Sequence, residues 1–342
     1  MASIQNSITL PLMPPLSSQT PQEKGSGSVG VEPSIVPKTA APGAEVSTLN
    51  NALIKADVLA KTLQTPTFKG EQKDDRVVAA QQFQNSLNGV ANSGVPLTPE
   101  QKTALQQTFE QVSPQVRMPA PQLMADQKKT VEDKVLWEKI ANAIGQINEE
   151  YLGVYENVVS NYTDFYTAYS DILSQMGSWI TPGADGNKVK LDVGKLLTAL
   201  NKLKTDYSLP NKAAVLFPTQ SDSGGITGSD IDTAKQWAKE LGLPESCVKP
   251  FNGNYVVVVD LTPVDTMIRD AGALGSGIVE MDNAKFQAWQ SGFKAQEENL
   301  KNTLQTLTQK YSNANSLYDN LVKVLSSTIS SCLETAKSFL QG

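Results

Sequence analysis

Adjacent carboxylates are the nearest approach to a catalytic arrangement in this sequence. Acidic pairs occur at Asp74-Asp75, Glu149-Glu150 and Glu297-Glu298. Paired carboxylates act as acid and base in glycoside hydrolysis when they face each other across a substrate. Neighbours in a helix do not face each other, so we interpret these pairs as solvated helix faces.

Two further motifs fit a metal or nucleotide site only in part. Asp185–Asp192 has the acidic residues of a calcium loop but lacks the required glycine and terminal glutamate, so a hairpin turn at Asp185-Gly186 explains it better. Gly25–Gly30 fits GxGxxG, yet no strand precedes it and no helical pattern follows it. We therefore expect no metal, no cofactor and no catalytic site. An enzyme would need a carboxylate cluster within residues 177–283.

The rest of the composition excludes further classes of site. The sequence contains no histidine, which removes the usual acid/base residue and the commonest metal ligand. Cys247 and Cys332 lie far apart and cannot form a zinc site alone. We expect buried free thiols, with a disulfide between them as the alternative. The net charge of −6, without a basic cluster, argues against nucleic acid as a partner.

Signals for membrane insertion or Sec export are also missing from the sequence. No stretch reaches 18 consecutive apolar residues, as a transmembrane helix requires. The N-terminus has no basic region and carries prolines where a signal peptide would be apolar. Residues 1–42 are rich in Pro, Ser, Gly and Thr, and we expect a disordered leader there.

The spacing of apolar residues predicts the helices and strands of the chain. Residues 43–121 should form a helical hairpin, a small third helix and a linker, with the third helix opening on a capping box at Thr98–Gln101. Residues 130–176 form a first heptad arm, whose seam alternates spacings of three and four. Its members are Trp137, Ile140, Ile144, Ile147, Tyr151, Val154, Val158, Asn161, Phe165, Ala168 and Ile172. Asn161 is its one polar member, a type of residue that often fixes register.

Residues 284–342 form a second heptad arm. Its seam comprises Leu300, Leu304, Leu307, Tyr311, Ala314, Tyr318, Leu321, Leu325, Thr328, Cys332, Thr335 and Phe339. Two such arms in one chain favour an antiparallel intramolecular coiled coil, and a homodimeric coiled coil is the alternative. Further apolar residues lie off the seam and need a third helix or a partner chain: Val159, Leu317, Val324, Ile329 and Leu333.

Between the arms, residues 177–283 lose the heptad period and indicate a mixed α/β insert. Asp192 can cap a helix, Ala214–Phe217 reads as a short buried strand, and Asn252-Gly253 predicts the clearest hairpin. The predicted fold is therefore mainly α, with a long intramolecular antiparallel coiled coil, an N-terminal helical hairpin and an inserted mixed α/β domain.

Three long blocks of the sequence resemble a known family. Tyr151–Ser160 (YLGVYENVVS), Tyr162–Met176 (YTDFYTAYSDILSQM) and Met281–Gly342 are similar to the needle-tip proteins of type III secretion systems, of the SipD/IpaD invasin type. The resemblance runs from about residue 130 to the C-terminus and weakens within 195–285. It implies the same order of hairpin, coiled coil and insert.

This resemblance implies a protein that leaves by the type III route, caps the extracellular needle and controls secretion. The implied partners are the needle subunit, the translocator proteins, for which it would be the platform, and copies of itself. It would be a monomer in solution and a small oligomer, a pentamer, at the tip. The hairpin would mask the coiled coil as a built-in chaperone, and the leader would be the export signal. A secreted helical effector acting on host proteins is the alternative.

The resemblance also implies sensing of bile salts in a groove beside the coiled coil. We assign the ligand and needle contacts to the second arm, at Leu317, Asn320, Lys323, Val324, Lys337, Phe339 and Leu340. We assign the coiled-coil core to Ile140, Ile144, Ile147, Tyr151, Val158, Phe165, Leu304, Leu307, Tyr311, Tyr318, Leu321 and Leu325.

Overall fold

The structure, a computed structural model, describes residues 42–68, 70–116, 130–221 and 223–341. The predicted leader lies outside the described residues except for Pro42, and the end of the predicted linker, from residue 117, lies outside them too. The helices are α1 (Pro42–Leu63), α2 (Glu71–Ser93), α3 (Pro99–Val116), α4 (Thr130–Gln146), α5 (Gly153–Trp179), α6 (Val193–Asp206), α7 (Ile231–Leu241), α8 (Thr262–Gly272) and α9 (Asn283–Gln341).

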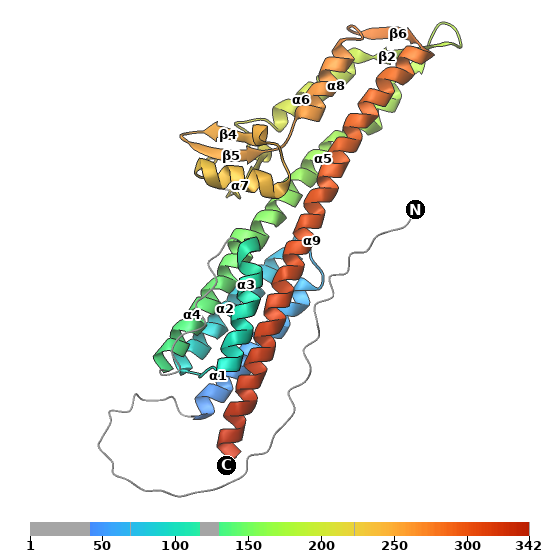
Figure 1. Cartoon of the computed structure of the whole chain (residues 1–342). Coiled ribbons are helices and arrows are strands. Elements are labelled where there is room, and N and C mark those ends of the chain that lie inside the picture. The colour runs from blue at the N-terminus through green and yellow to red at the C-terminus, as the bar shows by residue number, and fades with distance from the viewer. Residues whose placement is uncertain (1–41, 69, 117–129, 222, 342) are drawn as a thin grey trace, which may run out of the picture. The chain divides into compact units, whose positions relative to one another are not determined.

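An antiparallel pair of helices, α5 and α9, forms the centre of the fold (Figure 1). With 59 residues, α9 is about 88 Å long. Two tyrosine hydroxyls make hydrogen bonds between antiparallel helices. Tyr162 of α5 donates to the Leu300 carbonyl, and Tyr318 of α9 donates to the Ile144 carbonyl, each over 3.3 Å. The structure thus confirms the intramolecular antiparallel coiled coil.

A π-helical turn at Ile147–Leu152 joins α4 to α5 and changes the predicted seam. A π turn takes in one extra residue and so interrupts a strict heptad count, although the predicted seam residues Val154, Val158, Phe165 and Ile172 beyond it are still buried. Tyr155, Tyr162 and Tyr169 are buried, whereas the predicted seam residues Asn161 and Ala168 are only half-buried. The expectation of one uninterrupted heptad series from Trp137 to Met176 was therefore wrong.

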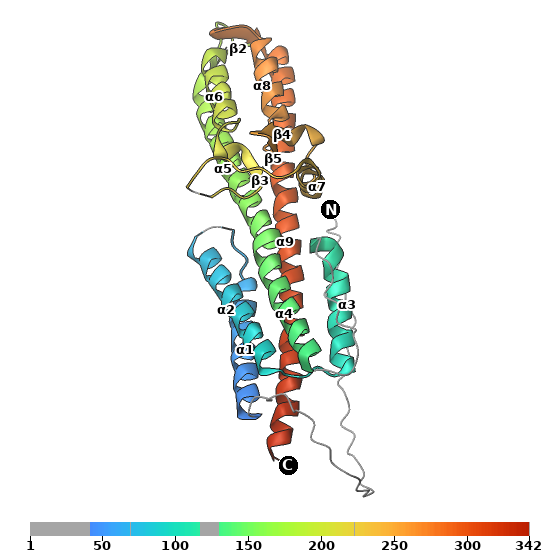
Figure 2. The ribbon, with the colours of Figure 1, turned by 90° about the vertical axis from the view of Figure 1, so that its left-hand side faces the viewer.

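The helical hairpin packs on this pair. α1 lies along both α2 and α9, and α2 lies along α4. Figure 2 shows α1 and α2 on one side of α9 and α3 on the other. Helix α2 comes so close to α4 that a Cβ at Gly145 would lie 2.6 Å from Nε2 of Gln84. The hairpin thereby supplies a third and a fourth helix. Of the predicted off-seam residues, Val159, Ile329 and Leu333 are buried, and Leu317 and Val324 are half-buried.

Two small antiparallel sheets make up the β part of the insert. One has the order β1-β2-β6 and joins the ends of α5 and α9; its strands are β1 (Ile180–Pro182), β2 (Lys188–Asp192) and β6 (Ile278–Asp282). The other has the order β3-β5-β4, with β3 (Val215–Phe217), β5 (Asn254–Val258) and β4 (Val248–Phe251). The predicted hairpin turn has positive φ at Asn252 (49°) and Gly253 (81°). Strand β6 was not predicted from the sequence.

The helices of the insert start where short acidic side chains can accept from free backbone N–H groups. Asp192 accepts from the N–H of Lys195 at the start of α6, as predicted, and Asp230 accepts from Thr233 at the start of α7. Thr262 does not cap α8; its own N–H donates to Asp260. At the start of each of these helices, one backbone N–H is thus satisfied by a nearby carboxylate.

Candidate interaction surfaces

A buried ion pair joins the hairpin to the central helices. Arg76 of α2 donates to Oε2 of Glu156 in α5 over 2.7 Å, and the two side chains are 3% and 0% exposed. The same guanidinium also donates to Asn148 in the π-helical turn. Tyr311 of α9 lies beside the carboxylate. Residues from α2, the turn, α5 and α9 therefore meet at one buried polar point.

The electrostatics of this point follow from its burial. Desolvation raises the pKa of the Glu156 carboxyl, and the Arg76 guanidinium beside it opposes the rise. Burial also raises the pKa of Tyr311 well above its usual value, and the nearby Glu156 carboxylate adds to this. A buried ion pair is stable only with both partners present, because removing one leaves an uncompensated buried charge. The hairpin is thereby fixed in one register on α5.

Two other polar contacts join α9 to α1 and α3 to α4. Asn315 of α9 donates over 2.8 Å to the carbonyl of Leu63, the last residue of α1. Lys102 of α3 pairs with Asp133 of α4 over 2.6 Å, with both side chains close to one-tenth exposed. The hairpin and α3 thus hold the coil by buried polar contacts as well as by apolar packing.

The insert is attached to α5 by a pair of asparagines. Asn157 and Asn161 donate to the carbonyls of Leu216 and Val215, each over 2.9 Å. They lie four residues apart and therefore share one face of the helix. Asn161 was expected to fix the register of the α5–α9 seam. It binds the backbone of β3 instead, so that expectation was wrong. It covers the exposed edge of β3.

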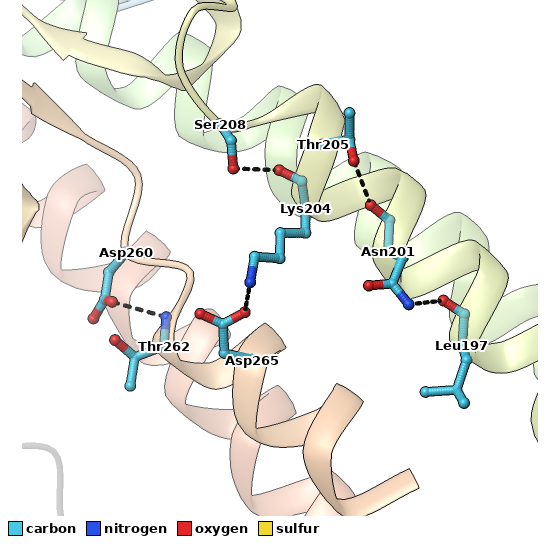
Figure 3. A network of polar contacts seen from close by, with 8 residues as sticks. All are labelled: Leu197, Asn201, Lys204, Thr205, Ser208, Asp260, Thr262 and Asp265. Atoms are coloured by element: carbon cyan, nitrogen blue, oxygen red, sulfur yellow. Dashed lines mark hydrogen bonds and ion pairs between the residues drawn. The ribbon is translucent and has the colours of Figure 1, made fainter. Parts of the chain in front are cut away.

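A second connection lies within the insert, and Figure 3 shows it at close range. Lys204 of α6 forms an ion pair over 2.6 Å with Asp265 of α8. Ser208 donates to the Lys204 carbonyl, and Asp260 accepts from the N–H of Thr262 (Figure 3). These groups border a cavity of about 350 Å³ that Cys247 and Tyr207 also line. The ion pair is half-exposed, so we expect it to add little stability.

The predicted core residues occupy the interior of the bundle. Eleven of the twelve are buried: Ile140, Ile144, Ile147, Tyr151, Val158, Phe165, Leu307, Tyr311, Tyr318, Leu321 and Leu325. The twelfth, Leu304, is half-buried. The seam of the second arm stops short of its predicted end, because Thr335 and Phe339 are exposed.

The predicted contact residues fall into two groups along α9. In the first, Leu317 and Val324 are half-buried against the core while Asn320 and Lys323 are exposed, and Lys323 pairs with Asp319. In the second, Lys337, Phe339 and Leu340 are all exposed, with Phe339 at 80% and Leu340 at 50%. Phe339 also borders a cavity of about 150 Å³ between α9, the start of α1 and the α2–α3 loop. The structure does not bring the two groups together.

Arg76, Asn148 and Glu156 were not predicted from the sequence. The available signal was position: Glu156 follows the apolar Tyr155 and lies two residues before Val158, on the side of α5 that the hairpin covers. Its partner lies 80 residues earlier in the chain, so spacing alone could not pair them.

The described part of the chain can be searched for a disulfide, for a metal site and for a membrane-spanning helix. Cys247 and Cys332 are free and buried, so they form no disulfide. Within the described ranges, no group of three or more His, Cys, Asp or Glu residues could hold a metal ion. No helix in those ranges is both long and apolar enough to cross a membrane.

Comparisons with known proteins agree with this architecture. Residues 5–340 match the family model for type III secretion systems tip complex components. The chain is 51% identical to the cell invasion protein SipD of Salmonella typhimurium over the full length of both, and 50% identical to the invasin IpaD of Shigella flexneri over 63% of this chain and 62% of IpaD.

The fold has a counterpart among solved structures. The crystal structure of the Pathogenicity island 1 effector protein from Chromobacterium violaceum matches with a TM-score of 0.69 and 49% identity, covering 86% of this chain and 96% of that one. The family match spans the hairpin, the coil and the insert together. The chain is therefore a member of the family of type III secretion tip complex components.

Proposed function

We propose that this protein caps the type III secretion needle, where it controls secretion and serves as the platform for translocator assembly on host membranes. The observation that carries the proposal is the family match over residues 5–340, which includes every described surface but the last residue of α9. The protein would act by binding its partners, the needle subunit, the translocators and copies of itself, and not by catalysis.

The C-terminal turn of α9 is the surface that we assign to the needle. Phe339 and Leu340 are large apolar side chains left exposed at the end of a helix that is otherwise packed, and Lys337 lies beside them. Exposed apolar residues with a neighbouring charge suit a protein interface. The coil around Leu317, Asn320 and Val324 is the surface that we assign to bile salts.

The hairpin within residues 43–121 would act as a built-in chaperone. Its helices lie along α9 and α4, and the off-seam residues Ile329 and Leu333 of α9 are buried. A hairpin that leaves would uncover faces of α9 and α4 for a second copy of the chain. With the hairpin docked, the protein would be a monomer in solution. With the hairpin released, it would form a small oligomer, a pentamer, at the tip.

The tip role is tested by immunogold electron microscopy on intact bacteria, with an antibody raised against residues 177–283. Label at needle ends supports the proposal. Label absent from needles, with the protein recovered inside host cells, favours the alternative of a secreted effector acting on host proteins.

The chaperone role is tested in the full chain with Arg76→Glu. This change places two carboxylates at the buried contact with Glu156 and should release the hairpin. Sedimentation velocity should then show self-association that the parent lacks. Arg269→Glu, at an exposed site on α8, is the control. A variant that unfolds would show lost helicity instead, and a folded variant that stays monomeric contradicts the masking role.

A further inference from the structure

A further cavity, of about 560 Å³, lies between the π-helical turn and the insert. The turn contributes Glu149, Glu150 and Tyr151 to its lining, and the insert contributes Phe217 from the end of β3 and Trp237 from α7. Nothing in the proposed tip function uses this cavity. Its walls combine aromatic rings with carboxylates.

The aromatic wall is held in place by ring contacts. Phe217 stacks on Trp237 with centroids 5.2 Å apart and an interplanar angle of 26°. Tyr151 lies 6.4 Å from Trp237 at 41°. Behind them, the fully buried Tyr155 makes edge contacts with both Tyr151 (5.2 Å) and Trp237 (5.6 Å). The wall is thus a packed unit in which Tyr151, Phe217 and Trp237 each keep less than one-tenth of their surface exposed.

The charge of the cavity has one sign. Among the described residues that line it, two are carboxylates and none is a lysine or arginine. Glu149 and Glu150 are exposed to water at the mouth of the cavity. Behind the wall, Glu240 accepts a hydrogen bond over 2.9 Å from the hydroxyl of Tyr155. Anions are therefore disfavoured, and a cation would be attracted both by the carboxylates and by the ring faces.

We propose that this cavity binds a quaternary ammonium group of the choline type. Such a group carries a positive charge on an apolar surface, so it contacts aromatic rings without losing strong hydration. A metal ion would gain nothing from the rings, and a neutral hydrocarbon would gain nothing from Glu149 and Glu150. The group could come from a free molecule or from a phosphatidylcholine head group, which present the same chemistry.

The test is titration of the full-length protein with choline while the indole N–H signal of Trp237 is followed by NMR. Trp237→Phe identifies that signal among the four tryptophans. The matched ligand is 3,3-dimethylbutanol, which replaces the charged nitrogen by carbon. We expect choline to bind about tenfold more tightly than this neutral isostere. Equal shifts with both ligands, or no shift with choline, would overturn the proposal.

Matched variants locate the charge effect. Glu149→Gln/Glu150→Gln should weaken choline binding by roughly tenfold and leave the fold intact, because both side chains are exposed. Glu297→Gln/Glu298→Gln removes the same charge from a pair on α9 outside the lining and should leave the affinity unchanged. If both double variants weaken binding equally, the attraction is general surface charge and the site is refuted.

Vesicles then separate the two sources of the ligand. Once choline binding is established, cosedimentation with phosphatidylcholine vesicles, absent with phosphatidylglycerol and lost in Glu149→Gln/Glu150→Gln, identifies a lipid head group. Choline binding without cosedimentation identifies a free cation. Either result supports the site. The outcome is independent of needle labelling, so it can fail while the tip function stands.

Discussion

Arg76 of α2 and Glu156 of α5 meet over 2.7 Å with almost no exposure to water. A buried ion pair contributes little net stability compared with apolar residues, but losing one partner is costly. When the whole hairpin leaves, however, both charges become hydrated together. The contact therefore selects one docked register of the hairpin without making its departure prohibitively costly.

Arg76→Met should lower the free energy of unfolding by about 3–5 kcal/mol, because it leaves the Glu156 carboxylate buried and uncompensated. Urea unfolding followed by circular dichroism measures this. Arg76→Met/Glu156→Leu should recover most of the loss, since neither charge then remains. A double variant as unstable as the single one would show that the charge is not the cause. Lys202→Met, in the exposed Lys202–Asp206 pair, should change stability by less than about 0.5 kcal/mol.

Asn157→Ala and Asn161→Ala should each lower the free energy of unfolding by about 1–2 kcal/mol, because each leaves a β3 carbonyl without its partner. Hydrogen exchange of the β3-β5-β4 sheet should accelerate more than that of α9. Asn201→Ala is the control, since Asn201 donates only to the Leu197 carbonyl of its own exposed helix face (Figure 3). Equal effects at all three positions would exclude a specific anchoring role for the α5 pair.

Sequence periodicity predicted both arms of the coil, and its error in the first arm has a physical cause. The buried residues run Ile147, Tyr151, Tyr155, Val158, so two spacings of four follow each other across the π-helical turn. Val154 is also apolar and buried, which made an uninterrupted series look equally good. Periodicity counts residues per turn and cannot reveal where one turn holds an extra residue.

Long-range polar contacts were beyond prediction for a different reason. The strand–helix attachment through Asn157 and Asn161 and the pair of Arg76 with Glu156 depend on which segments meet in space. Local patterns such as the Asp192 cap and the Asn252-Gly253 turn require only neighbours in sequence, and both were predicted. The contact residues Phe339 and Leu340 were assigned from resemblance, and the heptad series alone would have buried Phe339.

Cys247 and Cys332 should resist thiol reagents in the folded protein. Burial raises the pKa of each thiol to about 12, so almost no thiolate is present at pH 8. A disulfide reagent should modify two cysteines per chain only after urea is added. Because both pKa values are raised on folding, unfolding should become easier as pH rises from about 9 to about 12. Rapid modification at pH 8 without urea would show that these sites open readily.

Leu321→Asp should destabilise the coil by several kcal/mol, on the order of 3–5, because Leu321 is fully buried where α9 meets the bundle. Thermal unfolding and helicity report the effect. Asn320→Asp introduces the same carboxylate one residue earlier, at an exposed position, and should change stability by less than about 0.5 kcal/mol. Unchanged melting of Leu321→Asp would mean that this side chain is not in the core.

Phe339→Ser/Leu340→Ser should leave folding intact and impair capping of the needle. Both side chains are largely exposed, so their loss removes little buried area and should shift stability by less than about 0.5 kcal/mol. Needle-tip labelling and regulated secretion should both fall if these residues contact the needle subunit, because exposed apolar anchors dominate the energy of such interfaces. Ile278→Ser removes an equally exposed apolar residue from β6, at the opposite end of α9, and serves as the matched control. Normal labelling in the α9 variant would exclude this turn as the needle contact, whereas loss in both variants would point to a general effect of surface hydrophobicity on assembly.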